Sequence, residues 1–371
     1  MGFEGKVCID AGQDGRGGAT LKVDLQRPQL AQRLLAGVEP SQALSRVEQV
    51  FVVCRQSQRA AAMEALGLPR DPRLLQQKVL LESIEQLLWR LSIDLPHSLA
   101  LGAGMEPFAV IRRYISQQLA AESLDAHGDE LIQTLEGFFA SLSGVSCSEF
   151  LAFDRAQFES WLEIYNGLVP LCLRQVARVS IAPAPEGRGH GPVGLLPKQP
   201  VETLGLDQQL ADPDIGEKFC QQPSLDQQPR ETGPLAYMQS WPLIKQLQQA
   251  SASPLLLRYA AKLLYLASLI SRDALLQPQG ICGSVALDEG RLGWVNSVRG
   301  LLLHWVKLDA SETEIAEYRI CAPTEWNFHP QGQFSRLASQ VGIDHPQRKL
   351  ALEQIALALD PCVPFEVRIQ A

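Results

Sequence analysis

The chain has 371 residues, of which 46% are hydrophobic and 20% are charged, a composition typical of globular proteins and unlike that of disordered or fibrous chains. Its formal net charge is -8 at pH 7, and it contains no run of five Lys or Arg residues, which excludes the electrostatic pattern of a nucleic-acid-binding protein. The length by itself leaves the number of domains open.

Signals for secretion or membrane insertion are missing from the sequence pattern. The first ten residues contain no apolar segment of signal-peptide length, and the longest apolar stretch, 255–270, is interrupted by Arg258 and Lys262. We therefore predict a soluble cytoplasmic protein with no membrane insertion and no nucleic-acid partner.

The eight cysteines are scattered and form no CxxC or CxxH pair, so no zinc site or redox dithiol is encoded locally. Most are expected to be buried, inert thiols, because free cysteine is among the most buried residue types. A metal site would have to bring distant cysteines together.

The N-terminal part is predicted to form a hairpin followed by helices. Two short alternating segments, 7–9 and 21–25, are separated by a Gly-rich turn and read as antiparallel strands. Apolar residues three and four apart then predict helices over 28–36 and 40–48.

Cys54 lies at a predicted element boundary. It follows the apolar run 50–53 and precedes the segment 56–66, which is rich in helix-forming residues. The cysteine is therefore expected near a helix N-terminus, where the helix dipole favours a thiolate.

The rest of the chain alternates between helical and irregular patterns. Amphipathic periodicity predicts helices over 73–91, 107–119, 130–142, 149–165, 241–250, 254–277 and 347–359. Strand-like runs occupy 291–298, 302–308 and 317–321. Between the helices, residues 182–233 are rich in Pro, Gly and Gln and form a long excursion with little periodicity.

Five motifs occur in a fixed order along nearly the whole chain. They are LLAGVEP (34–40) with VFVVCRQS (50–57), ETGPLAY (231–237), NSVRGLLLHW (296–305), CAPTEWN (321–327) and DPCVPFEVR (360–368). In this order they resemble the motifs of nickel-iron hydrogenase large subunits: the lead-in to the first CxxC, ETGPLAR, PRGxLxH, PTTWN and the terminal DPCxxCxxH. The resemblance implies a mainly helical α+β fold, a helical bundle with small peripheral β-sheets, in a single domain 1–371 that contains the excursion 182–233.

The resemblance also implies a metal site that has lost half of its ligands. The family binds nickel and an iron carrying carbon monoxide and cyanide through four cysteines, two from each CxxC. Here the first cysteine of each pair is present, as Cys54 and Cys362, whereas the second, which bridges the metals in the family, is replaced by Ser57 and Phe365. A serine hydroxyl is a harder donor and phenylalanine cannot ligate. The usual bimetallic centre therefore cannot form.

Three further positions match groups around the family's iron. By resemblance, Arg299 corresponds to the arginine above the diatomic ligands, Thr324 to a hydroxyl that donates to a cyanide, and Asp360 to an acidic group above the site. A guanidinium can donate to cyanide nitrogen while balancing negative charge. Cys54 and Cys362 would then hold one iron fragment.

Other departures concern proton transfer and processing. The family's early glutamate falls near Gly17, Gly18 and Ala19, and its terminal histidine becomes Arg368. The chain ends at Ala371 without the extension that is cleaved from catalytic precursors after nickel insertion. We expect a protein that receives no nickel.

One group within the family combines these losses, namely the hydrogenase expression/formation proteins of the HupK or HoxV type. The resemblance implies a non-catalytic scaffold or chaperone that carries iron with cyanide and carbonyl ligands. Its expected partners are hydrogenase maturation proteins and the hydrogenase large-subunit precursor.

Alternative interpretations remain at this level. The chain could be a metal-free structural subunit, like the quinone-side subunit of respiratory complex I, or a degenerate hydrogenase or hydrogen sensor. Cys54 and Cys362 could be buried remnants of an ancestor, and Arg299 could serve only in an ion pair. His304 and Trp326 are expected to be core residues.

Overall fold

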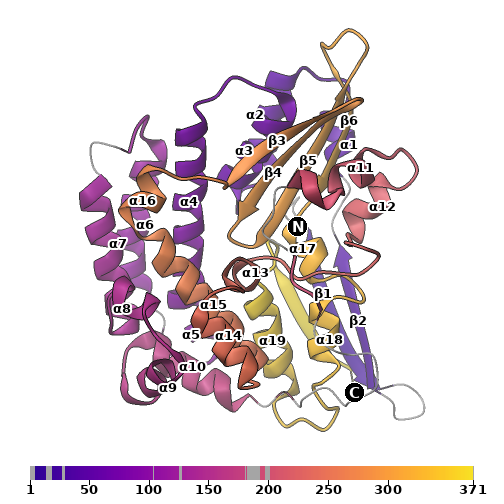
Figure 1. Cartoon of the computed structure of the whole chain (residues 1–371). Helices are drawn as coiled ribbons and strands as arrows, with labels where there is room; N and C mark the ends of the chain where they lie inside the picture. Colours follow the sequence, from indigo (N-terminus) through magenta and orange to yellow (C-terminus); the bar gives the residue numbers. More distant parts are fainter. Residues whose placement is uncertain are drawn as a thin grey trace.

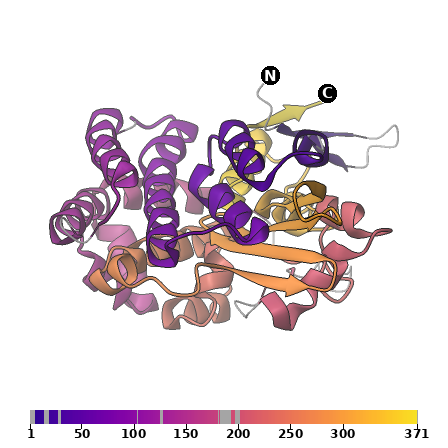
Figure 2. The same cartoon turned by 90° about the horizontal axis from the view of Figure 1, so that it is seen from above.

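The long helices lie on one side of the molecule and the two β-sheets on the other in the computed structural model (Figure 1). The helical side includes α4 (Pro72–Trp89), α6 (Met105–Ala120), α7 (Gly128–Ser143) and α15 (Pro254–Leu269). A view from above shows the same division (Figure 2). The predicted mainly helical α+β fold is confirmed.

The structure describes residues 5–13, 19–26, 30–102, 104–124, 128–179, 181, 193–196 and 201–370. The family correspondence at Gly17 and Gly18 falls outside these residues, as does most of the chain between 182 and 200.

The first sheet joins the two ends of the chain. Strands β1 (Lys6–Gln13) and β2 (Ala19–Gln26) form the predicted antiparallel hairpin, with Val7 opposite Leu25. The third strand, β7 (Phe365–Ile369), pairs in parallel with β1 and gives the order β2-β1-β7. This strand was not predicted, because it is only five residues long and its partner lies at the other end of the sequence.

The second sheet is an antiparallel meander covered on both faces. Its strands are β3 (Cys282–Leu287), β4 (Gly290–Ser297), β5 (Gly300–Leu308) and β6 (Ile315–Cys321), in that order. Helix α3 (Arg55–Leu66) packs on one face, and its backbone comes so close that a Cβ at Gly293 would lie 2.2 Å from the Ala61 carbonyl oxygen. This close packing fixes the second half of α3 against the sheet.

The described part of the excursion covers the opposite face of this sheet. It forms a 3-10 turn (Val201–Leu204), α11 (Leu206–Ala211) and α12 (Gly216–Gln221), and these pack against β5 and β6. Leu210 and Phe219 are buried in one cluster with Leu303 and Trp305. Burial on both sides explains why β5 is apolar at successive positions and not at alternate ones.

Two of the predicted helices are each divided into two in the structure. In both cases a capping residue inside the predicted helix starts a new one. The helix predicted over 149–165 is split into α8 (Cys147–Leu151) and α9 (Arg155–Ile164), because Asp154 accepts a hydrogen bond from the Gln157 backbone N–H at 2.8 Å and starts a new helix. The helix predicted over 254–277 ends at Leu269, and Ser271 caps a separate α16 (Arg272–Leu276).

The remaining helices complete the two sides. They are α1 (Leu30–Leu35), α2 (Pro40–Val50), a π-helical turn (Arg90–Asp94), α5 (Leu95–Ser98), α10 (Leu168–Arg178), α13 (Pro234–Met238), α14 (Pro242–Gln249), α17 (Pro323–Asn327), α18 (Gln333–Ala338) and α19 (Arg348–Leu359). The short helices α13, α17 and α18 were not predicted, because fewer than two turns leave little periodicity.

Gly233 is the glycine on which the position of Arg299 most depends. Its φ is +107°, and a Cβ there would lie 2.8 Å from the Arg299 carbonyl oxygen. We expect Gly233→Ala to lower the free energy of unfolding by about 2 kcal/mol or more, because strain and a backbone clash add. Urea unfolding measures this loss.

Gly205→Ala is the matched control for that substitution. Gly205 also has a positive φ, +62°, but no atom lies within 4 Å of the added Cβ. We expect it to lose only about 1 kcal/mol, the strain of a left-handed alanine. Equal losses for the two variants would contradict the close approach of Gly233 to Arg299.

Candidate functional site

Four segments distant in sequence meet between the helices and the second sheet. Cys54 begins α3, Arg299 lies in the turn between β4 and β5, Thr324 lies on α17, and Cys362 follows α19. Cys54, Arg299 and Cys362 line one small pocket of about 10 Å³, which is roughly the space of a single water molecule. The structure therefore brings together the two cysteines that sequence analysis singled out.

Cys362 is held by Thr324 through two contacts. The backbone N–H of Cys362 donates to Thr324 Oγ1 at 3.0 Å, and the same oxygen lies 3.0 Å from Cys362 Sγ. Because this oxygen already accepts from the N–H, its own hydrogen is available to the sulfur. Both residues are buried, so water does not compete for these contacts.

Cys54 is the N-cap residue of α3, as predicted, and is partly exposed. The positive end of the helix dipole acts on its side chain. Gln58, one turn further along the helix, donates from Nε2 to Cys54 Sγ over 3.8 Å. Its Oε1 contacts His304 Nε2 at 2.8 Å, and His304 Nδ1 lies 2.8 Å from the Tyr318 hydroxyl. His304 is thus the buried, hydrogen-bonded core histidine that was predicted.

Ser57, which by resemblance stands at the position of the second cysteine of the first pair, donates hydrogen bonds to a buried carboxylate, that of Glu82. Its hydroxyl donates to Glu82 Oε2 at 2.6 Å, and Glu82 also accepts from the backbone N–H groups of Ser57 and Gln56 at 3.0 and 2.7 Å. Glu82 therefore satisfies the open N-terminus of α3. Desolvation by burial outweighs these hydrogen bonds and raises the pKa of Glu82 to about 7.

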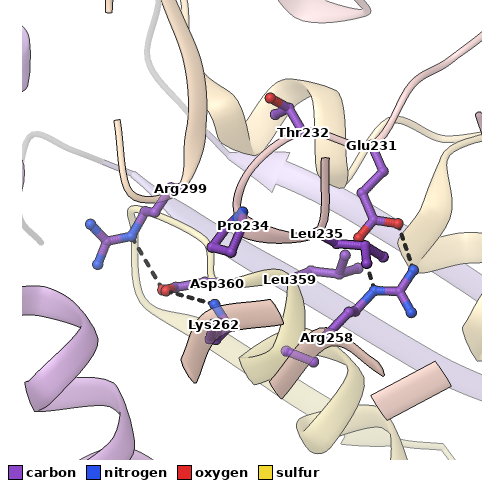
Figure 3. Close-up of a pocket in the computed structure, with 10 residues that line it drawn as sticks. Glu231, Thr232, Pro234, Leu235, Arg258, Lys262, Arg299, Leu359 and Asp360 are labelled. Carbon is purple, nitrogen blue, oxygen red and sulfur yellow. Dashed lines mark hydrogen bonds and ion pairs between the residues drawn. The ribbon is translucent and has the colours of Figure 1, made fainter. Parts of the chain in front are cut away.

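Asp360 pairs with three cationic side chains. Figure 3 shows two of them, Lys262 and Arg299. Its Oδ1 accepts from Arg90 and, at 3.2 Å, from Arg299 Nε, while Oδ2 accepts from Lys262 Nζ at 3.2 Å. Although burial opposes ionisation, the charges of Arg90, Lys262 and Arg299 hold the pKa of Asp360 well below its usual range. Asp360 ends α19 with φ of +56°, a left-handed conformation that Asp tolerates better than most residues.

The charged cluster carries an excess of positive charge. Arg90 also pairs with Asp94 at 2.5 Å, so three cations face two carboxylates when all five groups are ionised. Burial lowers the pKa of Lys262, which the attraction of Asp360 only partly offsets. A buried cation excess beside Cys362 favours an anionic occupant.

The ETGPLAY motif has a structural role beside this cluster. Arg258 pairs with Glu231 through two hydrogen bonds of 2.9 and 2.5 Å, as Figure 3 shows. Thr232 Oγ1 accepts from the Leu301 backbone N–H at 3.0 Å, and the Thr232 N–H donates to Asn327 at 2.9 Å. The motif thereby joins α15, β5 and α17 around the site.

An open groove with a volume of about 870 Å³ lies beside the small pocket. Cys362 and Arg299 line both cavities. The groove wall includes the exposed Val53, the ring of Trp89 and Phe365, the residue that replaces the family's last cysteine. This groove is the open side from which Cys362 can be approached, whereas Cys54 lines only the small pocket behind it.

Several residues of the site were missed by sequence reasoning. They are Gln58, Glu82, Arg90, Lys262 and Tyr318. A signal existed for Lys262, because it is a charged residue within a strongly apolar helix, and it is buried. Glu82 and Tyr318 carried no such signal, since their partners come from distant elements. The spacing of four residues between Cys54 and Gln58 could have indicated their contact on one helix face.

The other sequence candidates lie in the core. Trp326 is fully buried, as predicted, and His329 contacts the backbone N–H of Gln331. Burial raises the pKa of the Cys147 and Cys172 thiols to about 12, so neither is a ready thiolate. No grouping of three or more His, Cys, Asp or Glu side chains suited to a metal ion occurs in the described part of the chain.

In the same described residues, none of the helices combines the length and the apolar character that crossing a membrane requires.

Comparison with known proteins gives two kinds of likeness. No protein-family model matches the chain. The hydrogenase expression/formation protein HoxV of Cupriavidus necator is 29% identical over 365 residues, covering 92% of this chain and 91% of the relative. HupK of Azotobacter vinelandii is 28% identical, with 93% of each chain covered. These similarities confirm the resemblance seen in the motifs.

Solved hydrogenases share the fold. The Ni-Fe-Se hydrogenase of D. vulgaris Hildenborough matches with a TM-score of 0.56 at 14% identity, covering 92% of each chain. A NAD+-reducing [NiFe]-hydrogenase matches with the same TM-score at 13% identity and 94% coverage of each chain.

Asp360→Asn tests the buried charge cluster. The amide keeps the left-handed backbone conformation but leaves Arg90, Lys262 and Arg299 without their shared carboxylate. We expect the free energy of unfolding to fall by about 3–5 kcal/mol, the cost of breaking a buried ion pair. Urea denaturation measures this loss of stability. Asp94→Asn serves as the control and should cost less, because Asp94 is more exposed than Asp360. A loss no greater than that of Asp94→Asn would contradict this reading.

Glu82→Gln tests the raised pKa of the buried carboxylate. A native pKa of about 7 against an ordinary 4.5 means that the native state holds its proton more tightly. The stability contributed by Glu82 is therefore complete below pH 4.5 and is lost as the pH rises to about 7, by about 3 kcal/mol. As the pH rises from 4.5 to about 7, the free energy of unfolding of the wild type should fall, whereas that of Glu82→Gln should fall less. Parallel curves would show that the pKa is not raised.

Proposed function

Because this chain is homologous over nine-tenths of its length to hydrogenase expression/formation proteins and has the fold of hydrogenase large subunits, we propose that it is a non-catalytic assembly factor for nickel-iron hydrogenase. It carries the iron-cyanide-carbonyl part of the active site as cargo between Cys54 and Cys362. The observation that supports this proposal is the common pocket of these two cysteines and Arg299.

The two sulfurs have surroundings that suit thiolate ligands. Cys54 lies at the positive end of α3, and Cys362 receives the Thr324 hydroxyl. Thiolates are soft donors and suit an iron that carries cyanide and carbon monoxide. Two protein ligands, not four, would make such a fragment easier to release to another protein.

The charge of the site suits an anionic cargo. Cyanide and thiolate ligands together give the iron unit negative charge, and the cluster around Asp360 supplies an excess of positive charge beside Cys362. The Arg299 guanidinium is held by Asp360 and Gln86, which fixes its plane. It has five N–H donors, and those not used by these partners can donate to a cyanide nitrogen.

The positions of the family's two bridging cysteines carry no thiol in this chain. The Ser57 hydroxyl is committed to Glu82, and Phe365 is the first residue of strand β7. Neither position provides the bridging thiolate that nickel requires in the hydrogenase family. This supports a role in assembly over hydrogen catalysis.

The sizes of the two cavities bear on how the iron unit could enter the site. The pocket between the cysteines has room for a water-sized occupant, whereas a metal with several diatomic ligands is larger. Cys362 and Arg299 also line the open groove, so loading and release would proceed from that side. The proposed partners at this groove are hydrogenase maturation proteins and the large-subunit precursor.

Infrared spectroscopy of the protein purified from a maturation-competent host tests the proposal. We expect cyanide and carbonyl stretching bands and bound iron without nickel, and loss of both bands in Cys54→Ala and in Cys362→Ala. Cys172→Ala is the matched control, since it removes a buried thiol whose pKa is raised to about 12, and it should keep the bands.

Other outcomes would support other functions. Wild-type protein without iron and without these bands would refute iron carriage. Stable co-purification with membrane subunits, unaffected by either cysteine substitution, would support a structural subunit. Bound nickel with hydrogen-dependent dye reduction would support a degenerate hydrogenase or sensor.

A further inference from the structure

A chain of buried hydrogen bonds leads from the second sheet to Cys54. The Tyr318 hydroxyl lies 2.8 Å from His304 Nδ1, and His304 Nε2 lies 2.8 Å from Gln58 Oε1. Gln58 Nε2 in turn faces Cys54 Sγ at 3.8 Å. Gln58, His304 and Tyr318 are each at most 1% exposed, so water does not compete for these contacts.

Secondary structure places each member of this chain. Gln58 lies four residues after Cys54, on the same face of α3. His304 lies on β5 and Tyr318 on β6, where the register pairs Val306 with Tyr318, so the two side chains are diagonal neighbours on one face of the sheet. The contacts therefore depend on rigid elements and not on loops.

The donors and acceptors along the chain have one consistent order. With Gln58 Nε2 toward the sulfur, Gln58 Oε1 must accept, so His304 Nε2 carries the proton. In a neutral imidazole Nδ1 is then the acceptor, and Tyr318 donates to it. The reverse order would place the amide oxygen of Gln58 against the sulfur, which is unfavourable when the sulfur is a thiolate.

We infer that Gln58 is a positioning residue: held by His304 and Tyr318, its amide N–H donates to the sulfur of Cys54 when this cysteine binds the iron unit. The part that concerns iron rests on the proposed function. The orientation of Gln58 and the tautomer of His304 are properties of the metal-free protein. They do not depend on the proposed function.

Each of the two cysteine sulfurs then has one side-chain hydrogen-bond donor. Thr324 provides a donor to Cys362, and Gln58 provides one to Cys54. A hydrogen bond to a thiolate withdraws electron density from the metal–sulfur bond, and such surrounding partners tune metal sites. The effect on iron is weaker back-donation to its carbonyl ligand and easier release of the unit.

Nitrogen-15 NMR of the metal-free full-length protein tests the tautomer, with the His304 signal assigned by its loss in His304→Gln. We expect His304 protonated at Nε2, and a mixture of tautomers in Tyr318→Phe, which removes the donor to Nδ1. Tyr265→Phe is the matched control. Tyr265 is a buried tyrosine that does not take part in this series of hydrogen bonds, so its substitution should leave the His304 signal unchanged. Protonation at Nδ1 in the wild type would overturn the inferred orientation of Gln58.

Infrared spectra of the loaded protein test the effect on iron. In Gln58→Met, which keeps the side-chain volume but removes the N–H donor, we expect the carbonyl band at lower wavenumber with unchanged iron content. Tyr318→Phe, a milder change, should shift the band in the same direction by less, and Tyr265→Phe should not shift it. Retained iron with unshifted bands in both Gln58→Met and Tyr318→Phe would overturn the inference.

The two measurements separate this inference from the proposed function. Wild-type protein without iron bands refutes iron carriage, and with it the part of the inference that concerns iron. The NMR result still decides whether Gln58 presents its N–H to Cys54.

Discussion

The ion-pair cluster at Asp360 holds the functional region together. One carboxylate at the end of α19 contacts Arg90 at the end of α4, Lys262 on α15 and Arg299 in the β4–β5 turn. These contacts join the helical side to the sheet side at the point where Cys362 follows two residues later. Removing charges from water is costly, so a buried cluster persists only when its partners are placed together. The position of Cys362 and the charge around it therefore have the same origin.

The two substituted cysteine positions have structural roles of their own. Ser57 and Glu82 together satisfy the N-terminus of α3, which also orients Cys54. Phe365 begins the strand that pairs with β1 and follows Cys362 closely. Both residues therefore take part in the elements next to the cysteines: Ser57 in the start of α3 and Phe365 in the strand that follows Cys362.

Local signals accounted for much of the fold. The hairpin at the N-terminus, the long amphipathic helices and the helix start at Cys54 follow from periodicity and composition. The errors arose where capping overrode periodicity, as at Asp154 and Ser271, each of which starts a new helix inside an apolar pattern. Strand β7 was missed although FEVRI alternates apolar and polar residues, because a run of five residues is short and its pairing with β1 joins opposite ends of the chain.

For the site, the sequence by itself determined which chemical groups remain: two thiols, one arginine, one hydroxyl and one carboxylate in motifs of fixed order. It determined this because residue types within motifs can be compared directly. Only the tertiary structure decided that Cys54 and Cys362 share a pocket, that Asp360 binds three cations, and that His304 and Tyr318 lie behind Gln58. Those contacts join residues from distant elements. Burial and electrostatic interactions depend on which residues are close in space, and the order of residues along the chain does not reveal this.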